Sequence, residues 1–179
     1  DLFPVPQVDP PVQPAGYAFA IWSVIYVWLL ASAGFGLVKR DTDPAWDATR
    51  WPLIVSLVAG APWIAVAMMN AVVATVLIWV MLIAALLALR AAVRAGDFWW
   101  LAAPIGLYAG WLTAASSVSV GLLLGGFGVT GEIAAAWIAL VIALGVAVLV
   151  IGRFGTLTYT LAVAWALIAV AVQNFGGAL

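Results

Sequence analysis

Charged residues beyond the first ten positions fall in a few short clusters, and long uncharged stretches separate them. The clusters are Lys39 to Arg50 and Arg90 to Asp97, followed by Glu132 and Arg153 singly. A transmembrane helix needs roughly 20 consecutive apolar residues, and most of the stretches between these clusters meet that length. The pattern therefore predicts a chain that crosses a membrane several times.

The uncharged stretch from Leu53 to Leu89 is too long for one crossing. As a single helix its 37 residues would measure about 55 Å, whereas the bilayer core is about 30 Å thick. Asn70 is the polar residue nearest the middle, so we predict a turn there, with Pro62 kinking the helix before it. The predicted spans are residues 17–38, 53–69, 72–93, 98–124, 133–151 and 154–173.

Segments of this length predict helices rather than barrel strands. Every backbone polar group in lipid needs an internal partner, and barrel strands would be about 9–11 residues long and alternate in polarity. The fold class is all-α: a polytopic transmembrane bundle with six spans within residues 17–175. Residues 1–16 are expected to form an extracytoplasmic segment, and Asp43 with Pro44 is expected to begin a short interfacial helix.

The basic residues predict the orientation of the bundle. All six lie in alternate connections, at residues 39–52, 90–97 and 152–154, and the other connections and both ends have none. The positive-inside rule places these three connections in the cytoplasm and both termini outside. The expected location is the inner (cytoplasmic) membrane of a cell, crossed by several passes.

The composition narrows the chemistry. The chain is 68% hydrophobic and 7% charged, with no His and no Cys. Imidazole bases, thiolate metal sites and disulfides are thereby excluded, and Lys39 lies in a connection where it cannot carry a retinal. No ionisable residue falls at membrane depth, which disfavours an ion or proton pump. We expect no catalytic residue, no metal site, no covalent cofactor and no nucleic-acid partner.

The eleven tryptophans are only partly explained by an interfacial belt. A belt accounts for those at span ends: Trp46, Trp51, Trp99 and Trp100. Trp63, Trp111 and Trp165 lie near the middle of their spans. Aromatic walls with a few hydroxyls suit a large flat apolar ligand. Ordinary packing between helices is the commoner cause, and it is also the usual role of intramembrane hydroxyls and of pairs such as Gly106/Gly110 and Gly121/Gly125.

Three segments resemble a known family. Pro14 to Tyr26 (PAGYAFAIWSVIY) resembles the PPGWxFGPVWTxLY signature of the TspO/MBR family, the tryptophan-rich sensory proteins that include the translocator protein (peripheral benzodiazepine receptor). Ser56 to Trp63 resembles the family's LxLNxxW segment, and Leu107 to Ser119 resembles PYLxWxxFATxLN. The three segments occur in the family's order.

The sequence also departs from the family pattern. Gly60 and Ser119 stand where the family has Asn, and Leu107 stands where it has Pro. Family members have five helices, with one before the first motif and the last motif in the fifth. Here that first helix has no counterpart and two predicted helices follow the last motif, which is typical of a longer, divergent branch.

The resemblance implies a binding protein for tetrapyrroles such as protoporphyrin, or for other flat hydrophobic ligands, that acts as a sensor (receptor), regulator or transport carrier. Its implied ligand-binding residues are Phe19, Trp22, Tyr26, Trp63, Tyr108, Trp111, Ala115 and Ser119. The aromatic residues would stack on the ligand and Ser119 would offer a polar anchor. Without His, a porphyrin would be held by stacking rather than by imidazole ligation of a metal.

Two alternatives stay open. One is a structural or accessory subunit of a larger membrane complex, such as a pigment–protein complex. The other is a porphyrin-degrading enzyme, which the missing acid–base groups disfavour. The expected partners are the lipid bilayer and a hydrophobic small molecule, with a homodimer or a membrane complex left open.

Overall fold

The computed structural model describes residues 2–175, and this part of the chain is all helical, without strands. In chain order the elements are η1 (Gly16–Ala20, a 3-10 turn), α1 (Ile21–Lys39), α2 (Pro44–Gly60), α3 (Trp63–Ala67), α4 (Ala71–Ala95), η2 (Phe98–Ala102, a π-helical turn), α5 (Ala103–Gly126), α6 (Glu132–Phe154) and α7 (Leu157–Gln173). The all-α fold class is confirmed.

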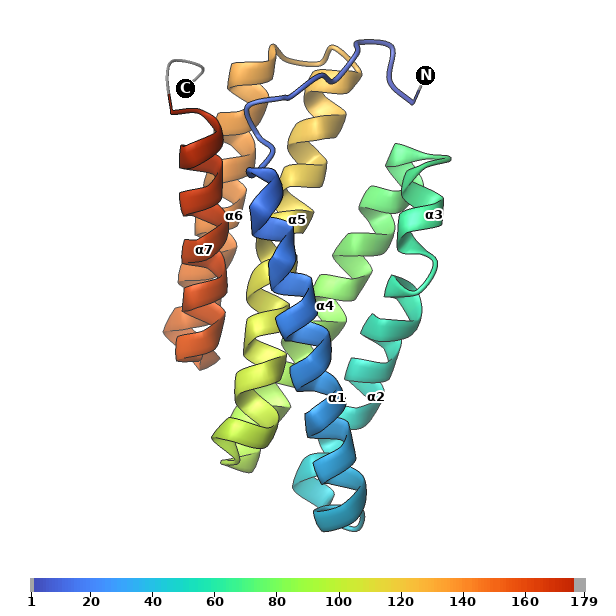
Figure 1. The fold of residues 1–179 in the computed structure, drawn as a ribbon, viewed down its shortest axis with the longest axis vertical. Coiled ribbons are helices and arrows are strands. Elements are labelled where there is room, and N and C mark those ends of the chain that lie inside the picture. The colour runs from blue at the N-terminus through green and yellow to red at the C-terminus, as the bar shows by residue number, and fades with distance from the viewer. Residues whose placement is uncertain (1, 176–179) are drawn as a thin grey trace.

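The helices form a bundle around α5 (Figure 1), which packs against α1, α4, α6 and α7. On one side of α5 stand α6 and α7, and on the other stands α4, covered by α2 and α3. The N-terminal segment and the α5–α6 loop lie at one end of the bundle, which we call the N-terminal end. The connections α1–α2 and α4–α5 lie at the opposite end, which we call the basic end because Lys39, Arg40 and Arg94 lie there.

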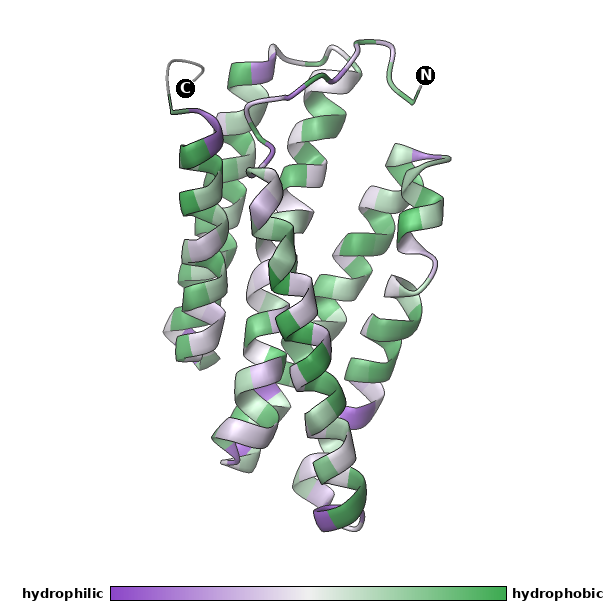
Figure 2. Cartoon of the chain, in the orientation of Figure 1, coloured by the Kyte–Doolittle hydropathy of each residue, from purple (hydrophilic) through white to green (hydrophobic). Residues whose placement is uncertain are grey.

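Four helical segments are long and apolar enough to cross a membrane, as expected of a membrane protein. They are Gly16–Lys39, Ala71–Ala95, Phe98–Gly126 and Glu132–Phe154. Apolar residues predominate along these helices, and hydrophilic residues gather towards the ends (Figure 2). Many of the large apolar side chains are exposed. The other two predicted spans are less regular: α7 has 17 residues, and α2 gives way to α3 between Gly60 and Trp63.

The prediction of a short interfacial helix at Asp43 is wrong in its length. The Asp43 carboxylate does accept the Ala45 N–H at 3.0 Å, with Pro44 in the first turn, but α2 then runs through Pro52 to Gly60. Its first turns pack against the bundle, because Trp46 is 4% exposed and its ring lies against Gly36 of α1. Trp46 is therefore a core residue, and its assignment to the interfacial belt is also wrong.

The predicted break and turn in the 53–89 stretch are confirmed. The helix is interrupted around Pro62, and the chain turns before Asn70, whose side-chain oxygen accepts the Val73 N–H at 3.0 Å and caps α4. The predicted connection at residues 152–154 is wrong. These residues belong to α6, and the connection is Gly155 and Thr156, because the Thr156 hydroxyl caps α7 by accepting the Tyr159 N–H at 3.2 Å.

Small residues allow α5 to hold a central position. Gly106 faces the hydroxyls of Thr156 and Thr158, and Gly110 faces the backbone of Tyr159, so that a Cβ at either glycine would overlap α7 or its cap. Hydrogen bonds reinforce the contact, since the Thr158 hydroxyl donates to the Ala103 carbonyl at 2.8 Å. The packing role predicted for these glycines is confirmed.

Candidate functional site: an apolar cavity under the N-terminal segment

A cavity of about 260 Å³ lies in the half of the bundle nearer its N-terminal end. It is partly open, and its walls are formed by α5, α6 and α7, by η1, by Trp63 of α3 and by residues 12–14 of the N-terminal segment. Its lining residues are Val12, Gln13, Pro14, Phe19, Trp63, Trp111, Ala114, Ala115, Ser117, Val118, Ser119, Leu122, Ala136, Ala139, Leu140, Ala143, Ala166, Leu167 and Val170. None of these lining residues is charged.

Small side chains create the space on the α6 side. Ala136, Ala139 and Ala143 line the cavity and recur at three- and four-residue intervals, so they share one face of α6. Two of them, Ala136 and Ala139, also pack with Val12 in a small apolar cluster. The small alanine side chains leave space that larger side chains would fill. The wall that they form is apolar.

Aromatic rings form the opposite wall. Phe19 of η1 meets Trp111 of α5 edge to face, with ring centroids 5.7 Å apart at 85°. Trp63 is fixed by a hydrogen bond from its Nε1 to the Ala74 carbonyl of α4 at 3.0 Å, and its ring reaches the cavity from α3. Fixed ring edges and faces of this kind suit contact with a flat apolar molecule.

The polar groups of the cavity act as acceptors. Ser117 donates its hydroxyl hydrogen to the Thr113 carbonyl at 2.8 Å, and Ser119 donates to the Ser116 carbonyl at 2.6 Å. Both hydroxyl oxygens keep lone pairs, so each can accept one hydrogen bond from a bound molecule. Gln13 is exposed and brings an amide to the rim of the cavity.

The N-terminal segment is tied across this end of the bundle by backbone hydrogen bonds. The Val5 N–H donates to the Gly126 carbonyl at 2.9 Å, and the Ala15 N–H donates to the Ala169 carbonyl at 3.1 Å. Between these points the Asn174 side-chain amide donates to the Pro11 carbonyl at 2.8 Å. Residues 12–14 are thereby held over the cavity from both α5 and α7.

Five of the eight sequence-predicted ligand residues line this cavity: Phe19, Trp63, Trp111, Ala115 and Ser119. The other three lie beside it as a separate aromatic group. Trp22 stacks on Tyr26 with centroids 5.2 Å apart, and it is 6.2 Å from Tyr108 and 6.3 Å from Trp111. The Trp111 ring therefore separates the cavity from this second group.

Tyr108 is engaged in a buried hydrogen-bond network. Its hydroxyl lies 2.8 Å from the Ser56 hydroxyl, which donates to the Met81 carbonyl at 2.7 Å. The Tyr108 hydroxyl is accordingly the donor to Ser56. The network connects α5 to α2 and α4, so the position of Tyr108 is explained by packing of the helices without a ligand.

We expect Tyr108→Phe to lower the free energy of unfolding by about 0.5–1.5 kcal/mol, the usual net contribution of one hydrogen bond. Ligand affinity should stay unchanged, because the ring that contacts Trp22 is retained. Thermal unfolding in detergent and fluorescence titration measure the two effects. Tyr26→Phe is the matched control, since the Tyr26 side chain is half exposed and should affect neither value.

Several lining residues were not among the sequence-predicted ligand residues. They include residues 12–14, the alanines of α6, and Ala166, Leu167 and Val170 of α7. The recurrence of alanine at positions 135, 139, 143 and 147 was a usable signal for this wall, because it marks one face of a helix that carries only small side chains. The resemblance could not supply the lining residues of α6 and α7, because its motifs end at Ser119.

Within residues 2–175 no group of three or more acidic residues is placed to hold a metal ion. Together, the helical bundle and its uncharged cavity define a class: an α-helical membrane protein with an internal apolar site. The chain belongs to the TSPO-like family, because the family model "TSPO-like protein" matches residues 6–178. Comparisons with curated proteins and with solved structures gave no match.

Proposed function

We propose that this protein binds a hydrophobic small molecule in the cavity and acts as a membrane sensor or carrier for it. The observation that carries the proposal is the wall of Phe19, Trp63 and Trp111 facing the alanines of α6 across an uncharged space. Apolar pockets with a few polar groups are the usual sites of such ligands. Membership of the TSPO-like family supports the same role. The lining offers no acid–base pair, which favours binding over catalysis.

The cavity volume bears on the size of the ligand. Pockets for drug-sized molecules measure roughly 300–1,000 Å³, and this cavity is slightly smaller at about 260 Å³. A flat molecule of a few fused rings fits the cavity as it stands. A tetrapyrrole, the ligand class implied by the resemblance, needs more room, and residues 12–14 are the wall whose displacement would provide it.

The test is a titration of the purified protein with protoporphyrin and, in parallel, with pyrene as a smaller flat probe. We expect saturable quenching of tryptophan fluorescence, weakened about tenfold by Trp111→Ala, since a buried aromatic contact contributes on the order of 1.4 kcal/mol. Trp51→Ala is the control, because Trp51 is 74% exposed and outside the cavity lining. Non-saturating quenching by both probes, or equal effects of the two variants, would refute the proposal.

We also propose six crossings with both termini outside the cytoplasmic membrane. The α2–α3 pair and α7 would provide the two crossings beyond the four long helices. The distribution of charge supports this orientation, since Lys39, Arg40, Arg94 and Arg153 all lie in or beside connections at one end of the antiparallel bundle. Single cysteines introduced at the exposed positions Ala48 and Val129 should react with a membrane-impermeant maleimide from the cytoplasmic and the outer side, respectively. Reversed labelling would refute the orientation.

An accessory role in a larger membrane complex remains the second candidate. Segment Gly16–Lys39 is the least buried of the four long helices, and Val27, Leu30 and Leu37 are exposed along it. Lipid covers such a face in a monomer, and another helix covers it in a complex. Purification in mild detergent distinguishes the two roles: fixed protein partners together with an unoccupied cavity would favour the accessory role.

A further inference from the structure

One exposed face of α4 changes from apolar to basic along its length. Val76, Val80, Ile83, Leu87, Arg90 and Arg94 are exposed and follow one another at three- and four-residue intervals. This spacing places them on a single stripe of the helix. The stripe therefore runs along the outside of the bundle and ends at the basic end in two arginines one turn apart.

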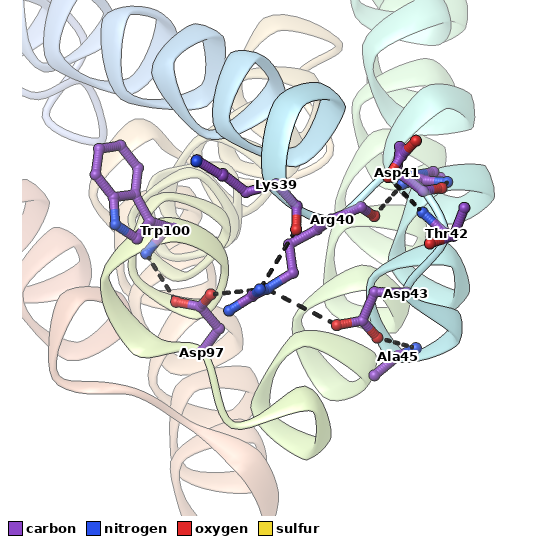
Figure 3. Close-up of polar contacts among 9 residues, drawn as sticks. Lys39, Arg40, Asp41, Thr42, Asp43, Ala45, Asp97 and Trp100 are labelled. Carbon is purple, nitrogen blue, oxygen red and sulfur yellow. Dashed lines mark hydrogen bonds and ion pairs between the residues drawn. The ribbon is translucent and has the colours of Figure 1, made fainter.

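The two arginines have no acidic partner among residues 2–175. The ion pairs in this part of the chain use Arg40 and Arg50 instead, with Arg50 2.7 Å from Asp47. The carboxylate nearest in sequence to Arg94 is Asp97, and it lies 4.0 Å from Arg40, which also approaches Asp43 at 3.8 Å (Figure 3). The aspartate that could neutralise Arg94 is thus directed towards α1.

We propose that Arg90 and Arg94 form a binding site for the phosphate of an anionic phospholipid, with an acyl chain lying on Ile83 and Leu87. Residues four apart on a helix have Cβ atoms about 5–6 Å apart, so both guanidinium groups can reach one phosphate. Arginine donates paired hydrogen bonds to phosphate and is weakly hydrated, which suits a headgroup at the membrane surface. The apolar half of the stripe selects a ligand that carries a chain over free phosphate.

Arg153 provides an internal comparison. It is exposed in the last turn of α6 at the same end of the bundle, and it forms no ion pair within residues 2–175. A single guanidinium without a neighbour one turn away cannot clamp a phosphate from two sides. If basic charge at this end acted only as a general attraction, Arg153 would contribute as much as Arg90.

The test is native mass spectrometry of the whole protein in detergent, titrated with phosphatidylglycerol or phosphatidylcholine. We expect a preference for phosphatidylglycerol that falls about thirtyfold in the double variant Arg90→Gln/Arg94→Gln, because each arginine contributes about fivefold to the affinity for an anionic headgroup. Arg153→Gln should change the affinity less than about twofold. Millimolar inorganic phosphate should not displace the lipid.

Unfolding midpoints and the single variant Arg90→Gln distinguish a loss of lipid binding from a loss of folding. Arg94 lies in the last turn of α4, where a cation favours the helix dipole, so unfolding midpoints in phosphatidylcholine are compared for all variants. Arg90→Gln alone leaves that terminus intact, should lose part of the preference, and serves if the double variant does not fold. Equal losses in Arg153→Gln and Arg90→Gln, no lipid preference in the wild type, or displacement by phosphate would each overturn the site.

Discussion

Ala115→Phe is expected to abolish saturable ligand binding while the protein stays folded. Ala115 lies on the cavity side of α5 and is only partly buried, so a benzyl group added there extends into the space instead of into a neighbouring helix. It would occupy a large share of the 260 Å³ cavity. We expect affinity to fall by more than about tenfold, and stability to rise by about 0.5–2 kcal/mol, as filled cavities commonly do.

A loss of affinity together with a gain in stability distinguishes a filled cavity from an unfolded variant. Affinity is measured by tryptophan quenching with the ligand that binds the wild type, and stability by thermal unfolding in the same detergent. Ala171→Phe is the matched control, because Ala171 is exposed on α7 outside the cavity and should keep the wild-type affinity. Undiminished binding in a folded Ala115→Phe protein would place the ligand elsewhere.

Gly110→Ala is expected to destabilise the packing of α5 against α7. The added methyl group would overlap the Tyr159 carbonyl and lie 2.8 Å from the Cβ of Ala162, so α5 and α7 would have to separate. Overpacking of this kind costs about 1–3 kcal/mol, against about 1 kcal/mol that alanine gains over glycine by helix propensity. We therefore expect a net loss despite the better helix former.

Gly145→Ala is the control for this substitution. A Cβ at Gly145 would meet nothing within 4 Å, so only the propensity gain applies and the unfolding midpoint should stay or rise. Both variants are measured by thermal unfolding in one detergent. If Gly110→Ala is as stable as Gly145→Ala, the close approach of α5 to α7 is not what holds the two helices together.

The helices were predictable from the uncharged stretches, but their ends were not. Asp47 and Arg50 seemed to exclude residues 44–52 from the second span, yet α2 includes both. The hydrocarbon core limits charge only within its own thickness, and a helix continues beyond it until capping or turn chemistry stops it. Buried Trp46 lies in this extension, and the contact with Gly36 that explains its burial is too distant in sequence to be inferred.

The candidate site was predictable where aromatic motifs mark it. Phe19, Trp63 and Trp111 stand out in the sequence because tryptophan and phenylalanine are few enough to form patterns. The alanine wall of α6 gives a weaker signal, since alanine at helical spacing serves any close packing equally well, and Val12 and Gln13 give none. For Tyr108 a ligand contact stays a prediction, because its hydroxyl is used by Ser56 and its ring lies beside Trp22, outside the cavity lining.

The cavity is bordered on one side by contacts between the first and last parts of the described chain. The Trp165 indole donates to the Ala18 carbonyl at 3.1 Å, and Asn174 reaches Pro11 across 163 positions of sequence. Contacts between segments far apart in sequence form late in folding, because both segments must be present and close together. During synthesis, α1 to α5 would therefore enter the membrane with this side open, and the nascent protein could retain a ligand only once α7 had been translated and inserted.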